Sequence, residues 1–168
     1  ASIRREGSTR FGENNKWGWF PALSGAWRIS EEPFMAGAKA VSNLKLRAGF
    51  GITGNQEIGN YRSLSILRKG SSNFYYNKKW ISTYEPGSNP NPDLRWEKKK
   101  EFNVGLDMSV LDNRLNVTVD YYNRRTKDLL YTYTVPVPPN LYPSKFANVG
   151  TIDNKGIEAV SYTHLRAH

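Results

Sequence analysis

The feature that most constrains this sequence is the strict alternation of apolar and polar residues along three stretches, residues 44–53, 101–110 and 115–122. Side chains that alternate with a period of two point to opposite faces of a β-strand, so each stretch predicts a strand with two unlike faces. The apolar face of these strands includes Leu44, Leu46, Phe50, Phe102, Val104, Leu106, Met108, Leu115, Val117 and Val119. Residues 17–30 alternate less regularly because Pro21 interrupts them, and we expect that strand to bend or to begin late.

The connections between the predicted strands are uneven in length. Residues 111–114 (Leu-Asp-Asn-Arg) predict a tight turn that joins two strands into an antiparallel hairpin. Residues 54–95 and 125–154 lack convincing alternation and are rich in turn residues and proline, which predicts two long loops. Helical patterns are nearly absent, and only residues 33–41 predict a turn or two of helix. With weaker strand signals near both ends, at 1–6 and 155–160, the fold class is all-β, an antiparallel meander.

The composition excludes several classes of protein. The chain contains no cysteine, so it has no disulfide framework, no cysteine-ligated zinc site and no thiol nucleophile. Its two histidines are His164 and His168, which leaves none for catalysis or metal binding in the rest of the chain. Hydrophobic residues make up 38% of the sequence, and no run approaches the roughly 20 apolar residues of a membrane-spanning helix. We therefore predict no enzyme, no cofactor and no helical membrane segment.

Long alternating strands with tight turns at one end and long loops at the other are typical of an outer-membrane barrel. Lipid cannot hydrogen-bond the backbone, so such strands pair side by side with apolar faces toward lipid and polar faces toward a wet lumen. The turn at 111–114 would then be periplasmic and the two long loops extracellular. Aromatic residues near the predicted strand ends are candidates for the interfacial belts, namely Trp17, Trp19, Trp96 and Tyr121. Core or cross-strand packing of these rings is the alternative.

A second interpretation is a soluble β-sandwich or open barrel that binds carbohydrate or nucleic acid, because a sandwich strand also has one wet face. The formal net charge of +9 and the runs Lys98–Lys100 and Arg124–Arg125 favour an anionic partner. These charges flank strand ends rather than form one stripe, so we interpret them as solvated charges of a lumen and its loops, not as a nucleic-acid site. Extracellular cations would also meet anionic lipopolysaccharide.

Three further motifs contain residue types that bind ligands or catalyse reactions in other proteins. Residues 49–54 fit the pattern G-x-G-x-x-G, but no helix is predicted after them, which argues against a dinucleotide site. Glu97 and Glu101 fall on one face of a strand about 13 Å apart, too far for a pair of glycosidase carboxylates. Four aromatic residues of the first long loop could either stack on sugar rings or pack within the loop, and we favour packing: Tyr75, Tyr76, Trp80 and Tyr84.

Several blocks of the sequence, spread in order along residues 1–159, resemble the SusC/RagA family of TonB-dependent outer-membrane transporters. They include Arg-Glu-Gly-Ser-Thr-Arg-Phe-Gly at 5–12, Leu-Lys-Leu-Arg-Ala-Gly-Phe-Gly-Ile-Thr-Gly-Asn at 44–55, Asn-Pro-Asp-Leu-Arg-Trp-Glu at 91–97 and Asp-Tyr-Tyr-Asn-Arg-Arg-Thr-Lys-Asp-Leu-Leu at 120–130. After Ile157-Glu158 the pattern stops, and residues 160–168 resemble translated adapter sequence, so we expect a non-native tail there.

The resemblance implies that residues 1–159 are about six strands of a 22-stranded barrel. It implies an importer of glycan oligosaccharides or peptides in the outer membrane of Bacteroidota-type bacteria. It further implies energy from TonB, through parts absent from this chain, and a surface lipoprotein of the SusD type as partner. In that interpretation the residues of this chain supply barrel wall and extracellular loop rather than chemistry.

Overall fold

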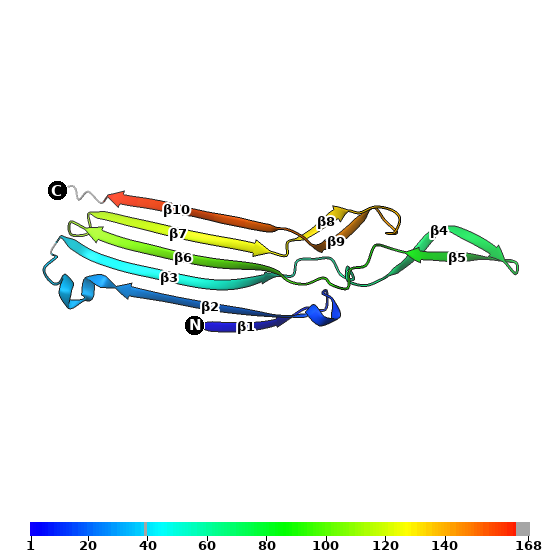
Figure 1. Ribbon diagram of the computed structural model, residues 1–168, viewed down its shortest axis with the longest axis horizontal. Helices are drawn as coiled ribbons and strands as arrows, with labels where there is room; N and C mark the ends of the chain where they lie inside the picture. The colour runs from blue at the N-terminus through cyan, green and yellow to red at the C-terminus, as the bar shows by residue number, and fades with distance from the viewer. Residues whose placement is uncertain (39, 164–168) are drawn as a thin grey trace.

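The computed structural model of the protein describes residues 1–38 and 40–163. These residues form one six-stranded sheet and two two-stranded sheets (Figure 1). The strands of the large sheet are β1 (Ser2–Gly7), β2 (Trp17–Arg28), β3 (Val41–Asn55), β6 (Glu97–Val110), β7 (Leu115–Lys127) and β10 (Thr151–Thr163). The small sheets pair β4 (Leu67–Tyr76) with β5 (Lys79–Pro86), and β8 (Leu130–Thr134) with β9 (Ser144–Asn148).

The large sheet has the order β1-β2-β3-β6-β7-β10, and every neighbouring pair is antiparallel. Strands β3, β6 and β7 contain the three alternating stretches of the sequence, and β1 and β10 contain the two weaker ones. The register aligns like faces, because Leu46 lies opposite Leu106 and Leu106 lies opposite Val119. The predicted all-β antiparallel meander is therefore confirmed.

The two longest connections lie at one end of the sheet and the tightest turn lies at the other, as Figure 1 shows. The tight-turn end carries the segment between β2 and β3 and the turn at 111–114, where Leu111, Asp112 and Asn113 adopt left-handed backbone. The long-loop end carries residues 8–16, 56–96 and 128–150. The helix predicted at 33–41 is replaced by short 3₁₀ turns, at Ile29–Glu31 and Pro33–Met35.

Strand β2 does not begin late, as one of the two predicted effects of its proline would require. It runs from Trp17 to Arg28, with Pro21 opposite Ile3 of β1. Pairing with β3 begins only at Ala22, directly after the proline. Pro21 thus lies where β2 has a partner on one side only, and such edge positions are where a strand tolerates a residue without an N–H.

Both predicted long loops contain short β-hairpins that the sequence pattern did not reveal. Residues 54–95 include β4 and β5, joined by Asn77 and Lys78, which both have positive φ, as a tight two-residue turn requires. Residues 125–154 include β8 and β9, and they also hold the ends of β7 and β10. Nearly all residues of β4 are exposed on both faces, so no apolar-polar alternation marks the strand.

The buried core lies at the long-loop end and not within the large sheet. It consists of Phe11, Phe20, Ile58, Leu94 and Trp96. The Trp96 ring lies 5.0 Å from the ring of Phe11 and 5.2 Å from that of Phe20, and its indole N–H donates to the carbonyl of Lys16 at 3.1 Å. The predicted belt position of Trp96 is wrong, because a side chain only 2% exposed has no contact with a membrane interface. Trp96 lies just before the first residue of β6, so the alternation of the strand does not determine which way its side chain points.

The end of β10 differs from the strands before it. Ile157 and Ala159 continue the apolar face beside β7, but then Val160 and Tyr162 fall on the polar face and Ser161 on the apolar one. Alternation is thus reversed at the start of the segment that we predict to be a non-native tail. Residues 164–168, including both histidines, lie outside the described residues, and the non-native origin of 160–168 stays a prediction.

Candidate functional site

One face of the large sheet is an exposed apolar surface. The register places all ten apolar positions of the alternating stretches on this face, next to residues of β2 and β10. Its large exposed side chains include Trp17, Trp19, Leu23, Trp27, Phe50, Phe102, Leu106, Val119, Tyr121 and Ile157, which are 36% to 73% exposed. Soluble monomers rarely expose a contiguous apolar surface of this kind, and such surfaces mark contact with a membrane or a partner.

Of the predicted belt residues, Trp17 and Trp19 lie at the start of β2 on this apolar face. The guanidinium of Arg5 stacks on both rings, 4.3 Å from the centroid of Trp17 and 5.3 Å from that of Trp19. Tyr121 shares the face, opposite Val104. A cation beside two exposed indole rings at a strand end has the composition of a membrane interface, where apolar rings and charged tips coexist.

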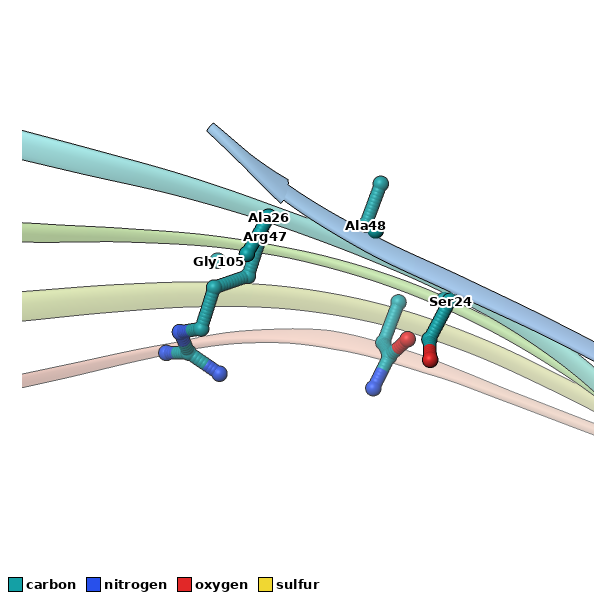
Figure 2. Close-up of a pocket in the computed structure, with 8 residues that line it drawn as sticks. Ser24, Ala26, Arg47, Ala48 and Gly105 are labelled. Atoms are coloured by element: carbon teal, nitrogen blue, oxygen red, sulfur yellow. The ribbon is translucent and has the colours of Figure 1, made fainter. Parts of the chain in front are cut away.

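The opposite face is polar and ion-paired. Arg47 of β3 donates to both carboxylate oxygens of Asp107 on β6, at 2.7 and 3.0 Å, and to Asp120 on β7 at 3.0 Å. The Thr118 hydroxyl donates to Asp107 at 3.2 Å. Figure 2 shows Arg47 and Ser24 on one side of the sheet and Ala48 on the other. A bidentate guanidinium that spans three strands fixes the register of this face.

Gly105 makes the three-strand bridge possible. It lies between Arg47 and Asp120 in the register. A Cβ at this position would meet the Asp120 Oδ1 at 2.2 Å and the Arg47 Nη2 at 2.6 Å, closer than atoms of real side chains approach. The glycine thus leaves the space across β6 through which the guanidinium reaches the second carboxylate.

Glu97 and Glu101, which the sequence spacing places too far apart to act as a catalytic pair, bind different partners. Glu97 accepts hydrogen bonds from the Leu130 N–H at 3.0 Å and from the Asn55 amide at 3.5 Å. Glu101 pairs with Lys99 at 3.2 Å and with Arg124 at 3.0 Å. Both carboxylates thus contact neighbouring strands or loops, and the two do not pair with each other.

The four loop aromatics all lie on the β4–β5 hairpin. Tyr75 and Trp80 face each other across the two strands with ring centroids 5.2 Å apart. Each of the four rings remains more than half exposed. Tyr76 also packs against Phe74, with ring centroids 6.0 Å apart. Packing within the loop is thus present for three of the four rings, and a role in stacking on sugar rings stays a prediction for the exposed faces.

The sequence predicts no catalytic or cofactor site. Across residues 1–38 and 40–163, no cluster of three or more His, Cys, Asp or Glu side chains could hold a metal ion. Within the same described ranges, no helix is long and apolar enough to cross a membrane. Sequence reasoning missed the Arg47 network, although Arg47, Asp107 and Asp120 all fall on polar positions of predicted strands.

A sheet with one exposed apolar face and one ion-paired polar face, with short turns at one end and long connections at the other, has the architecture of a transmembrane barrel wall. Residues 1–166 match the family described as "TonB dependent receptor-like, beta-barrel". The chain belongs to this family.

Individual relatives agree with this membership. TonB-dependent receptor P39 of Formosa agariphila is 45% identical over 159 residues, which are 94% of this chain and 15% of the relative. TonB-dependent receptor SusC of Bacteroides thetaiotaomicron is 38% identical over 160 residues, 94% of this chain and 16% of that protein. Among solved structures, the RagAB peptide importer in its "closed-closed" state matches with a TM-score of 0.84 and 31% identity, covering 99% of this chain and 18% of that one.

The comparisons confirm the predicted resemblance to the SusC/RagA family, the barrel fold and the outer-membrane location. They decide against a soluble β-sandwich, and membership in a family of transporters agrees with the prediction that the chain is not an enzyme. The chain spans 15% or 16% of the length of the two curated relatives named above. Activity, substrate and partners therefore concern a larger protein, of which these residues correspond to a part.

Proposed function

We propose that this chain forms part of the barrel wall and the extracellular rim of a TonB-dependent importer. In this proposal the apolar face meets lipid, the polar face lines the lumen, and residues 1–159 make up the barrel segment. The observation that carries the proposal is the contrast between the faces, with exposed large apolar side chains on one and the Arg47–Asp107–Asp120 network on the other. Paired strands with this contrast satisfy their backbone internally, as the membrane interior demands.

The proposal assigns the long-loop end to the outside of the cell and the tight-turn end to the periplasm. Outer-membrane barrels carry long extracellular loops and short periplasmic turns. The buried core around Trp96 lies at this end, where it packs the connection at residues 8–16 against both ends of the connection at residues 56–96. At this rim the transporter would capture its ligand before energy from TonB drives passage through the barrel.

The proposed cargo is a glycan oligosaccharide or a peptide. The similarity to the RagAB peptide importer supports a peptide, and the glycan class follows from the resemblance of the sequence to the SusC/RagA family. The same relatives support a SusD-like surface lipoprotein as partner. TonB would act through segments outside the present residues, and basic side chains of the rim would meet lipopolysaccharide. We propose no contact with nucleic acid.

Spin labelling of neighbouring positions tests the assignment of the faces. These residues contain no cysteine. In the full-length transporter, with any cysteine elsewhere replaced by serine and reconstituted in lipid, Val104→Cys and Asn103→Cys place a nitroxide on opposite faces of β6. The label at 104 should collide often with dissolved oxygen, which concentrates in the bilayer, and rarely with a water-soluble nickel complex. The label at 103 should show lower exposure to oxygen. Equal oxygen exposure at both positions would contradict the assignment.

A further inference from the structure

The two long connections are held together by one asparagine. The Asn89 amide donates to the carbonyls of Tyr142 and Ser144, at 2.7 and 2.8 Å, and its oxygen accepts from the N–H groups of Leu141 and Tyr142, at 3.0 and 3.2 Å. Both donors and both acceptor sites of the side chain are thus used. Asn89 is buried, so the junction between the two connections is a fixed structure.

A cavity of about 250 Å³ opens at this junction, lined by Arg62, Arg68, residues 87–89, Thr132, residues 142–144 and Phe146. Two arginines line it. Arg62 lies over the ring of Phe146, 5.8 Å from its centroid, and Arg68 lies over the ring of Tyr142 at 5.4 Å. Stacking on aromatic faces restricts the rotamers of both guanidiniums before any ligand arrives, which lowers the entropy lost on binding.

The charges of the two arginines are not equally available. Arg68 pairs with Glu85 at 2.8 Å. For Arg62, no carboxylate lies within ion-pair distance among the described residues. The charged side chains that line the cavity are Arg62 and Arg68, and only Arg68 has a carboxylate partner. The cavity therefore has an excess of positive charge, with Arg62 as its uncompensated cation.

We propose that this cavity is a subsite for the carboxylate group of the imported ligand. The inference rests on the proposed function and narrows it to acidic cargo. A planar guanidinium matches a carboxylate with two parallel hydrogen bonds. The volume suits one unit of a ligand rather than a whole oligomer, since sites for drug-sized molecules usually measure roughly 300–1,000 Å³. The carboxylate could come from a uronic-acid sugar or from the free end of a peptide.

Calorimetric titration of the purified full-length transporter tests the subsite with four probes. Two are acidic, a uronic-acid trisaccharide and a tripeptide with a free carboxyl end. Two are their neutral counterparts, the methyl-esterified trisaccharide and the amidated tripeptide. We expect an acidic probe to bind and its neutral counterpart to bind at least about tenfold more weakly, as the loss of a charge-assisted hydrogen bond implies. The acidic probe that binds identifies the source of the carboxylate.

Arg62→Gln should weaken binding of that acidic probe by about tenfold to a hundredfold. Lys78→Gln is the matched control, because it removes one positive charge from the tip of the β4–β5 hairpin, outside the cavity, and should leave affinity nearly unchanged. Arg62→Lys keeps the charge but not the planar fork and should lie between. Heat-modified mobility on gels confirms that each variant is a folded barrel.

Three results would overturn the subsite. They are equal affinity for an acidic probe and its neutral counterpart, an equal effect of Arg62→Gln and Lys78→Gln, and no binding of either acidic probe to the wild-type transporter. Each would leave the barrel-wall proposal intact, because spin labelling of residues 103 and 104 tests that proposal without any ligand. Failure of the labelling experiment with intact acidic binding would instead contradict the assignment of the faces alone.

Discussion

At the scale of single residues, the polar face depends on what Gly105 lacks. The Arg47 guanidinium passes over β6 to Asp120 only because no Cβ occupies that position. Gly105→Ala should displace the bridge and cost about 1–3 kcal/mol of unfolding free energy, as overpacking does elsewhere. Gly25→Ala is the control, because a Cβ there meets nothing within 4 Å. Urea unfolding of the transporter in lipid vesicles measures both, and equal losses would contradict the role of Gly105.

Adjacent residues on β6 offer a second test at this scale. Val104→Arg places a cation on the apolar face and should cost about 2–4 kcal/mol if that position lies near the middle of the bilayer. Asn103→Arg adds the same side chain to the polar face and should have a much smaller effect. Refolding from urea into lipid vesicles, as the urea concentration is lowered, measures the difference in folding free energy between the two variants. Comparable losses for the two variants would mean that the apolar face does not meet lipid.

At the scale of elements, side chains replace the backbone where two extended segments meet. Pro90 and Pro92 have no N–H to offer to β9. Instead, the side-chain amides of Asn89 and Asn91 donate to the carbonyls of Ser144 and Phe146. Asn148 completes the junction with hydrogen bonds to Arg95 and to the carbonyl of Asp128. Nearby, the Asp128 carboxylate holds the pKa of Arg95 above its ordinary value by accepting a hydrogen bond from it.

Asn89→Ala should therefore loosen the junction without unfolding the sheet. The N–H groups of Leu141 and Tyr142 lose their acceptor, and each lost part-buried hydrogen bond costs about 0.5–1.5 kcal/mol. Hydrogen exchange should accelerate at these two amides and leave β6 and β7 unchanged. Asn140→Ala is the control, because that exposed side chain makes a single hydrogen bond within its own loop. Unaltered exchange at Leu141 and Tyr142 would contradict the role of Asn89 in holding the junction.

The elements also explain which parts of the fold the sequence could predict. Strands β3, β6 and β7 were predictable because their two faces meet different surroundings. Apolar and polar residues therefore alternate along them with a period of two. Strands β4 and β8 have solvent on both faces. Turn geometry and tertiary contacts, such as the hydrogen bonds of Asn89, position these small sheets instead of a buried face. Trp96 was misplaced because alternation ends where the strand ends. The cavity beside Arg62 joins residues far apart in sequence, and no local pattern marks such a site.

At the scale of the whole molecule, the exposed surface is too large for an independent soluble protein. The accessible area is 12519 Å² at 19.1 kDa, whereas a compact monomer of this mass exposes about 8,400 Å². Within residues 1–38 and 40–163, six apolar side chains are buried, all at or near the long-loop end. Within the described residues, β1 and β10 each pair on one side only, which leaves two open edges. An open edge is costly in lipid, where backbone groups have no other partner.

These properties predict the behaviour of the 168-residue chain when it is produced alone. In plain buffer it should aggregate or remain largely unfolded, because neither its apolar face nor its edges are covered. Detergent should keep it in solution without giving the heat-resistant compact form of a closed barrel. The full-length transporter, in which neighbouring strands cover both edges, should show that form. Light scattering and sedimentation in buffer with and without detergent measure the difference, and a stable folded monomer in plain buffer would contradict the barrel-wall proposal.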